Sequence, residues 1–282
     1  MLSVITTLKN RADLLYYGLS SIIRQTAFHN ILSKIEINIG DGGSSDNIDD
    51  VLESISYHNR VVINKWVIDR NRSSYKHILN CPAEEYNILV KLSKYDYILK
   101  IDPEFVIITP DFVGRAISQL QTGQPKLIMP LPHHVYDFDY KSLDDIKNNY
   151  EKYEYKTHIT SGTAHDTNVY YGCMFPKNAF IKLGGIDIRF LKFIGSEDGH
   201  FIERWKRTYG PNVHTFIDCH GVHLWHGRWG KALPRYLKND IEMGAKLKKK
   251  LMGRNPNNGD LSSVRFPENI PKAVWMNGKR VE

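Results

Sequence analysis

The most informative stretch of the sequence is Lys94-Tyr-Asp-Tyr-Ile-Leu-Lys-Ile-Asp-Pro-Glu-Phe-Val106. Its apolar part, Tyr97 to Ile101, predicts a buried strand that ends at two carboxylates, Asp102 and Glu104. The proline between them ends ladder hydrogen bonding and holds Asp102 extended, so both side chains can project from a tight turn. Because ligands of open α/β sheets bind at the carboxyl ends of strands, this turn is a candidate binding site.

Two carboxylates at this spacing suit a hard divalent cation, Mg²⁺ or Mn²⁺, bound together with a substrate phosphate. The alternative is that an Asp-Pro-Glu turn only ends a strand, and for an isolated motif this alternative is favoured. The elements on both sides of the motif reverse that preference.

Strands alternate with helices through the first hundred residues. The expected strands are 2–6, 35–39, 61–68 and 97–101, and the expected helices open at 10–13, 48 and 82. Such alternation predicts an α/β fold with a mainly parallel sheet flanked by helices. A helix at 111–121 and a strand at 126–131 follow, whereas residues 132–168 show no clear period and receive no role.

Composition sets the outer limits. With 282 residues, 41% of them hydrophobic, the chain can form one large α/β domain or two small ones. A formal net charge of +7 indicates a surface that attracts polyanions such as nucleotide sugars, nucleic acid or an anionic membrane, or one that only aids solubility. No apolar run reaches membrane-spanning length and no signal segment is evident, which predicts a cytoplasmic protein. The three cysteines are too few and too scattered for a disulfide framework or a zinc site.

A second acidic pair, Glu197 and Asp198, follows a helix that Gly184-Gly185 ends. The pair is expected at the start of another helix, where the helix dipole stabilises carboxylates and capping alone would explain them. The functional interpretation is that one acid is a general base. Beyond a strand at 213–217, His223 and His226 lie close enough in sequence to bind one metal ion, and Arg228 could neutralise a diphosphate.

Four segments resemble the nucleotide-binding half of the GT-A glycosyltransferases of the large family-2 type. They are Val4-Ile-Thr-Thr-Leu-Lys-Asn-Arg11, Asp41-Gly-Gly-Ser-Ser-Asp-Asn47, Glu85-Tyr-Asn-Ile-Leu-Val-Lys-Leu-Ser93 and Tyr97-Ile-Leu-Lys-Ile-Asp-Pro-Glu104. Gly184-Gly-Ile-Asp-Ile-Arg-Phe190, followed by the acidic pair, resembles a signature of the inverting enzymes. The chain departs from the family with Asp-Gly-Gly-Ser-Ser-Asp in place of Asp-Gly-Ser-x-Asp and Asp-Pro-Glu in place of Asp-x-Asp.

The resemblance implies a role for each matched residue. Asp198 would be the general base and Glu197 a partner that orients the acceptor. Mn²⁺ or Mg²⁺ would bind Asp102, Glu104 and one of His223 and His226, as in the galactosyltransferase-like group with a C-terminal histidine segment. The donor nucleotide would contact Thr6, Asn10, Arg11, Asp41, Arg72, Asn87, Asp102 and Arg228.

The sequence therefore predicts a GT-A glycosyltransferase domain over residues 1–236, divided into a nucleotide-sugar half at 1–107 and an acceptor half at 108–236. Residues 237–282 would form a basic helix and a tail that lies on the surface, the helix being a solvated face or a polyanion-binding edge. The expected reaction is metal-dependent, inverting transfer from a UDP-sugar to an acceptor hydroxyl of a glycan, a lipid-linked glycan or modified DNA. A nucleic-acid-binding protein and a nucleotidyltransferase are the alternatives, although the lysine-bearing glycine-rich loop expected of the latter is not seen.

Overall fold

The computed structural model describes ten segments of the chain: residues 2–25, 35–59, 61–67, 82–136, 138–157, 171–192, 197–226, 235–252, 273–276 and 279–280. Arg72 and Arg228, both expected near a diphosphate, lie outside these segments.

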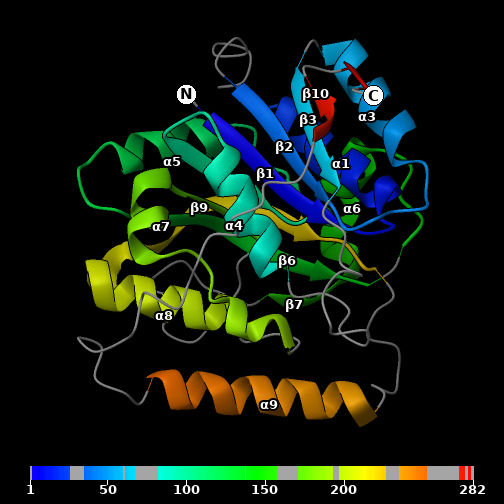
Figure 1. The fold of residues 1–282 in the computed structure, drawn as a ribbon. Helices are drawn as coiled ribbons and strands as arrows, with labels where there is room; N and C mark the ends of the chain where they lie inside the picture. Colours follow the sequence, from blue (N-terminus) through cyan, green and yellow to red (C-terminus); the bar gives the residue numbers. More distant parts are fainter. Residues whose placement is uncertain are drawn as a thin grey trace.

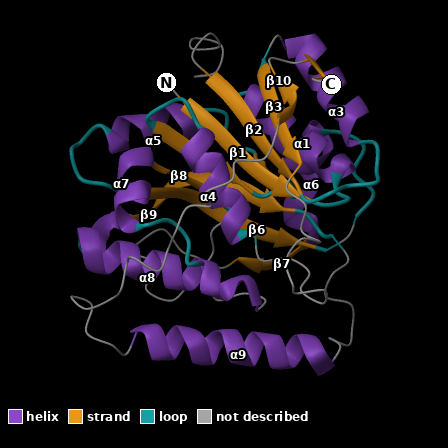
Figure 2. Cartoon of the chain, viewed as in Figure 1, coloured by secondary structure: helices purple, strands orange, loops and turns teal. Residues whose placement is uncertain are grey.

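The described strands form one 11-stranded mixed sheet (Figures 1 and 2). The strands are β1 (Leu2–Leu8), β2 (Ile35–Asp41), β3 (Val62–Val67), β4 (Tyr97–Ile101), β5 (Phe105–Ile107), β6 (Leu127–Val135), β7 (Glu154–Thr157), β8 (Gly172–Pro176), β9 (His214–His223), β10 (Ala273–Met276) and β11 (Lys279–Arg280). Their order is β11-β10-β3-β2-β1-β4-β8-β6-β9-β5, with β7 paired to β6. The pairs β3–β2, β2–β1, β1–β4 and β6–β9 are parallel, and the remaining pairs are antiparallel.

Helices cover both faces of the sheet (Figure 2). They are α1 (Ala12–Ile23), α3 (Ile48–Asn59), α4 (Ala83–Leu92), α5 (Phe112–Leu120), α6 (Leu143–Tyr153), α7 (Lys177–Leu183), α8 (Glu197–Tyr209) and α9 (Arg235–Met252). Apolar side chains of α1, α3 and α5 pack in one cluster with the sheet, and those of α4, α7 and α8 pack in another on the opposite face. No helix in the described segments is long and apolar enough to cross a membrane.

Strand β4 supplies side chains to both layers, because successive residues of a strand point to opposite faces. Leu99 and Ile101 belong to the α1 layer and Ile98 to the α4 layer. Lys100 therefore points toward α4, where its ammonium lies 4.9 Å from the centre of the Tyr86 ring. A lysine thus occupies a position that would ordinarily carry an apolar core residue.

The sheet topology brings the predicted site segments to one edge. Strands β1, β2 and β4 are parallel to one another. Strand β8 is antiparallel to both β4 and β6, so β6 runs in the same direction as β4. Strand β9 is parallel to β6 and shares this direction. The carboxyl ends of β1, β2, β4, β6 and β9 consequently lie on one side of the sheet, where α/β proteins bind ligands.

The strand Tyr97–Ile101 and the helix that begins at Glu197 are confirmed. Residues 132–168 contain more structure than expected: β6 continues to Val135, and α6 begins after Ser142, whose hydroxyl accepts a hydrogen bond from the Asp145 backbone N–H (3.1 Å). Within the tail, β10 pairs with β3 and so extends the sheet beyond the β3 edge; the expectation that the tail lies on the surface stays a prediction.

Candidate active site

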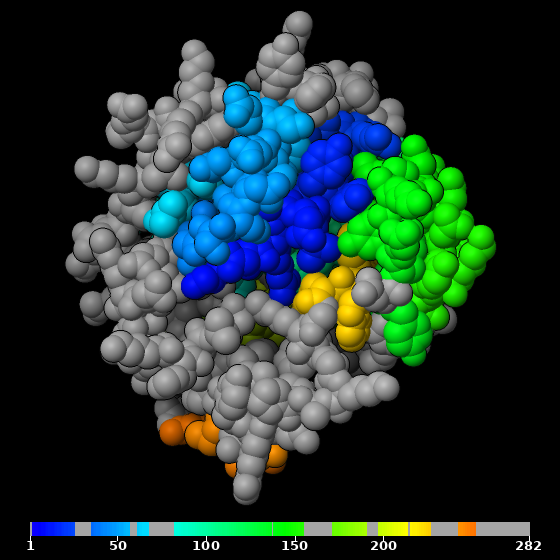
Figure 3. Space-filling view, turned by 90° about the vertical axis from the view of Figure 1, so that its right-hand side faces the viewer, coloured from blue at the N-terminus to red at the C-terminus, as the bar shows by residue number. Residues whose placement is uncertain are grey.

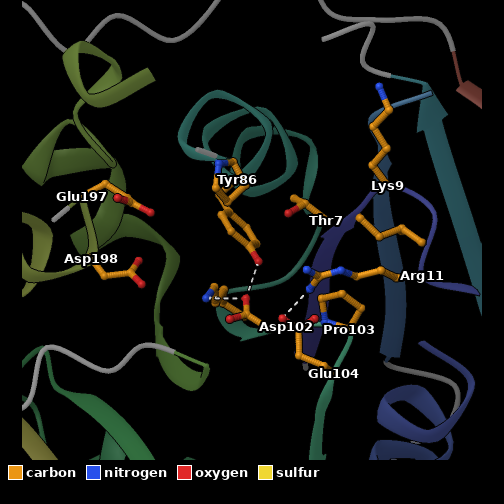
Figure 4. Close-up of a pocket in the computed structure, with 12 residues that line it drawn as sticks. Thr7, Lys9, Arg11, Tyr86, Asp102, Pro103, Glu104, Glu197 and Asp198 are labelled. Carbon is orange, nitrogen blue, oxygen red and sulfur yellow. Dashed lines mark hydrogen bonds and ion pairs between the residues drawn. The ribbon is translucent and has the colours of Figure 1, made fainter. Parts of the chain in front are cut away.

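The β1–α1 loop, helix α4, the end of β4 and the start of α8 enclose one pocket (Figure 4). Its lining residues are Thr7, Leu8, Lys9, Arg11, Pro82, Tyr86, Lys100, Asp102, Pro103, Glu104, Glu197 and Asp198. In the space-filling view a hollow lies between the blue N-terminal residues and the yellow end of β9 (Figure 3). The two acidic pairs that the sequence predicts, separated by about ninety residues of chain, therefore meet in one place.

Asp102 is held by two polar side chains of the pocket. Its Oδ1 accepts a hydrogen bond from the Tyr86 hydroxyl (2.8 Å) and lies 2.7 Å from the Lys100 ammonium. Burial would lower the pKa of Lys100, but Asp102 and Asp198 outweigh it and raise that pKa, so the lysine stays charged. A buried cation thus lies among the acidic groups of the pocket.

Glu104 lies in a second polar group at the end of β4. Its Oε1 forms an ion pair with the Arg11 guanidinium, which also lies 3.3 Å from Nδ1 of His226. Nε2 of His226 and Nε2 of His223 lie 3.4 Å and 3.8 Å from the same carboxylate oxygen. Burial would raise the pKa of Glu104, but Arg11 and His223 hold it at about 2, so this carboxylate is ionised at neutral pH.

Three of the four predicted metal ligands meet in this group. One ligand atom each from Glu104, His223 and His226 lies within 4.8 Å of the others. The residues fit a divalent cation, because Glu104 Oε2 is buried without a hydrogen-bond partner among the described residues. Burial also lowers the pKa of His223 to about 4, so its ring is neutral and keeps a lone pair for a metal.

Asp102, the fourth predicted ligand, is not part of this group. Its Oδ1 accepts a hydrogen bond from Tyr86 and pairs with Lys100. The two carboxylates of the Asp-Pro-Glu turn therefore have different partners in this structure, and their membership of one ligand set stays a prediction.

The acidic pair on α8 faces Asp102 across the pocket (Figure 4). Burial and the neighbouring Asp198 raise the pKa of Glu197 to about 8, and its Oε2 has no hydrogen-bond partner in the described segments. Burial raises the pKa of Asp198 to about 6, against the opposing effect of Lys100. At neutral pH Glu197 therefore carries a proton while Asp198 is mostly ionised. Glu197 can then donate a hydrogen bond, and Asp198 can accept a proton.

Replacing Glu197 by Gln should stabilise the protein as pH rises. The unfolded chain releases this proton near pH 4.5 and the folded chain near pH 8, so the wild type loses stability as pH rises between these values. Gln does not titrate, and we expect the variant to gain about 1–3 kcal/mol over the wild type at pH 8. Thermal unfolding from pH 5 to pH 8 measures the difference, with Glu203→Gln on the same helix as control. A gain that stays constant with pH would contradict the assignment.

The segment before α8 is held by contacts that fix its backbone. The Asn87 amide donates to the Ile186 carbonyl (2.8 Å) and accepts from the Ile186 N–H (2.8 Å), and Arg204 donates to the Gly185 carbonyl (2.9 Å). Gly185 has a φ of +71°, and a Cβ there would lie 2.4 Å from Asn87 Oδ1. Asn87, which the sequence predicts at the nucleotide, is fully buried, and its amide bonds this backbone. These hydrogen bonds anchor the segment that leads toward the acidic pair.

The other N-terminal residues expected at the nucleotide occupy three different environments. Asn10, with a φ of 54°, joins two loops, since its N–H donates to Ser44 Oγ (2.9 Å) and its Oδ1 accepts from the Ser45 N–H (2.8 Å). Asp41 accepts from the Ser44 N–H (2.8 Å) and ends β2 at the site edge. Thr6 is fully buried and does not line the pocket, whereas Arg11 does.

Lys100 and Tyr86, the two side chains that hold Asp102, are among the pocket residues that were not predicted. The signal for Lys100 was present, because a lysine inside an apolar strand is buried only when a carboxylate pairs with it. Tyr86 gave no such signal, since a tyrosine on the inward side of a helix is ordinarily a core residue.

No protein-family model matches the sequence, and comparison with curated proteins also finds no match. Solved structures do match. S. aureus TarS 1-349 in complex with UDP-GlcNAc has a TM-score of 0.57 and 10% identity, over 87% of this chain and 65% of that one. Mannosyltransferase PcManGT from Pyrobaculum calidifontis, in complex with GDP-Man and Mn²⁺, has a TM-score of 0.56 and 13% identity, over 93% of this chain and 68% of that one.

Glucosyl-3-phosphoglycerate synthase from Mycobacterium tuberculosis, in complex with Mg²⁺ and UDP, has a TM-score of 0.50 and 10% identity, over 88% of this chain and 79% of that one. The chain spans less than two thirds of TarS, covering 65% of its 1-349 fragment and 40% of another TarS chain. At these identities the likeness establishes the fold: the chain has the GT-A fold that its sequence motifs predict.

Proposed function

We propose that the chain is a metal-dependent, inverting glycosyltransferase that moves a sugar from a nucleoside-diphosphate sugar to an acceptor hydroxyl. The observation that carries the proposal is one pocket that is lined both by Glu104, the carboxylate grouped with His223 and His226, and by the acidic pair at the start of α8. The structural neighbours solved with UDP-GlcNAc, GDP-Man and UDP support such a donor, and a UDP-sugar is the donor we favour.

Glu104, His223 and His226 would hold Mn²⁺ or Mg²⁺. When bound, the metal would bind the diphosphate and stabilise the charge that develops as it leaves. Arg11, which lines the pocket beside Glu104, would add a second positive charge to the same leaving group.

His223 is the better ligand of the two histidines, because a guanidinium only donates hydrogen bonds. The contact from Arg11 makes Nδ1 of His226 an acceptor, and a ring that accepts at Nδ1 carries its proton on Nε2, the atom nearest Glu104. We expect His223→Ala to weaken Mn²⁺-dependent nucleotide binding at least tenfold more than His226→Ala, in line with typical losses at metal sites. Paired titrations with and without Mn²⁺ measure this, and equal losses would contradict the assignment.

Asp198 would take the proton from the acceptor hydroxyl as that oxygen attacks the anomeric carbon on the face opposite the diphosphate. Its pKa of about 6 suits a base that must be ionised at neutral pH and still accept a proton. Glu197, protonated at the same pH, can donate a hydrogen bond and so orient an acceptor oxygen.

Release of nucleoside diphosphate from a panel of UDP- and GDP-sugars tests the activity, because many transferases slowly transfer to water when no acceptor is present. We expect release from at least one donor, its loss with EDTA and its recovery with Mn²⁺. Absence of release from every donor, combined with salt-dependent DNA binding, would instead favour a nucleic-acid-binding protein.

A further inference from the structure

Five aromatic side chains form a connected series of ring contacts on the α1–α6 side of the molecule, and a sixth aromatic residue, Tyr136, is bonded to this group through its backbone. Successive ring centres lie 5.5 Å apart for Tyr16–Tyr17, 5.1 Å for Tyr17–Tyr140, 5.2 Å for Tyr140–Phe138 and 4.4 Å for the stacked pair Phe138–Tyr153. Tyr136 joins through its backbone N–H, which donates to the Tyr153 carbonyl (2.8 Å). We refer to the group as the aromatic platform: Tyr16, Tyr17, Tyr136, Phe138, Tyr140 and Tyr153.

The outer rings of the platform are open to solvent. Tyr16, Tyr136 and Tyr153 are 43%, 59% and 40% exposed. The three inner rings are partly buried and pack against an apolar cluster that includes Leu14 and Ile146. Solvent-exposed aromatic rings on a rigid support are characteristic of recognition surfaces, because they offer a large contact area with little loss of side-chain entropy.

The platform lies beside the candidate active site. His134, in register with His223 in the neighbouring strand, has its ring 5.0 Å from the His223 ring, and Tyr136 follows two residues later. Tyr16 belongs to α1, which begins immediately after Arg11. In Figure 3 the green residues of the α6 region stand next to the yellow end of β9 at the side of the hollow.

The segment that carries four of the six platform residues is acidic. Residues 136–154 contain six carboxylates and three lysines, a formal −3 in a chain whose formal net charge is +7. Burial, Tyr16, Asp13 and Asp145 together raise the pKa of the Tyr17 hydroxyl, which places Asp145 of this segment and Asp13 of α1 close to the Tyr17 ring. A nucleic acid or a phosphate-rich polymer would meet repulsion here, whereas an uncharged ligand would not.

We propose that the aromatic platform is an acceptor subsite that binds an uncharged oligosaccharide. The C–H faces of sugar rings pack on aromatic rings, and sugar hydroxyls can bond the tyrosine hydroxyls and the neighbouring carboxylates. The inference rests on the proposed function, and it assigns the acceptor to the class of neutral glycans. A sugar on the platform would extend along the side of the hollow toward the pocket.

Binding of neutral hexasaccharides of glucose, mannose, galactose and N-acetylglucosamine, with an anionic hyaluronan hexasaccharide for comparison, tests the proposal by saturation-transfer NMR and calorimetry. The test variant is Tyr136→Ser/Tyr153→Ser, which changes two exposed rings outside the pocket. The matched control is Tyr95→Ser, which precedes the amino end of β4 and so lies at the opposite edge of the sheet. UDP and GDP binding with Mn²⁺ is measured on the same samples.

We expect at least one neutral hexasaccharide to bind the wild type and the control, and to bind the double variant about tenfold more weakly while nucleotide binding stays unchanged. Nucleotide binding without binding of any neutral hexasaccharide would overturn the subsite and leave the proposed function intact. Stronger binding of the anionic hexasaccharide would also overturn it. A change of oligomeric state would overturn it as well. If the wild type were a dimer and the double variant a monomer, the platform would be a subunit interface.

Discussion

Asp198→Asn should lower the rate of sugar transfer by about 10²–10⁴-fold, the usual loss when a general base is removed. Asn has the shape of Asp but accepts no proton, and the Glu104–His223–His226 group does not include this residue. Nucleotide binding should therefore stay within about twofold of the wild type, since that group is proposed to hold the diphosphate through a metal. Transfer rate and nucleotide affinity, measured on the same preparation, give both quantities.

The pH dependence of the wild type gives an independent check on the same residue. A pKa of about 6 means that Asp198 gains a proton as pH falls through 6, so activity should fall on the acid side of that value. The Glu203→Gln variant on the same helix should keep both rate and pH profile. Loss of nucleotide binding together with activity in Asp198→Asn would contradict the base role, because the residue would then support the donor site.

Glu104→Gln should abolish the effect of Mn²⁺ on nucleotide binding, a loss of roughly 100-fold or more in the metal-bound affinity. Gln offers a neutral oxygen where the pocket now holds an ionised carboxylate. The same change leaves the Arg11 guanidinium, whose side chain is 13% exposed, without its ion-pair partner, which should cost about 3 kcal/mol of stability.

The double variant Arg11→Met/Glu104→Gln separates these two consequences. Removing the unpaired cation should recover most of the lost stability, whereas the affinity ratio with and without Mn²⁺ should remain near one. Asp102→Asn is the matched comparison within the turn, and because Asp102 stands outside the metal group, it should retain a Mn²⁺ effect. A normal Mn²⁺ effect in Glu104→Gln would remove Glu104 from the ligand set.

Much of this architecture could be predicted from local sequence patterns. Tyr97–Ile101 is an apolar run ended by a proline, so both the strand and its carboxylate-bearing end follow from elementary backbone chemistry. Glu197 and Asp198 follow a glycine pair and open a helix, as their spacing predicts. Because the parallel strands align their carboxyl ends, the convergence of these segments also follows from the alternation of strands and helices.

The partners of individual side chains were harder to predict. Asn87 carried the right chemistry for a ligand contact, yet its amide bonds the backbone of Ile186, 99 residues away. Asp102 contacts Lys100 and Tyr86, whereas Glu104 contacts Arg11 and two histidines, although only Pro103 separates the two carboxylates in sequence. Such pairings depend on which side chains the fold brings together, and the spacing of apolar residues along the sequence does not predict them.

Calorimetric titration of the wild type with UDP and GDP, once with Mn²⁺ and once after EDTA, is the decisive test of a metal-dependent nucleotide site. We predict that at least one nucleotide binds with Mn²⁺ and that EDTA weakens its binding at least tenfold, since Glu104 and His223 would lose the cation that joins them to the diphosphate. Absence of binding by both nucleotides, or equal binding with and without Mn²⁺, would contradict a metal-dependent nucleotide-sugar site in this pocket.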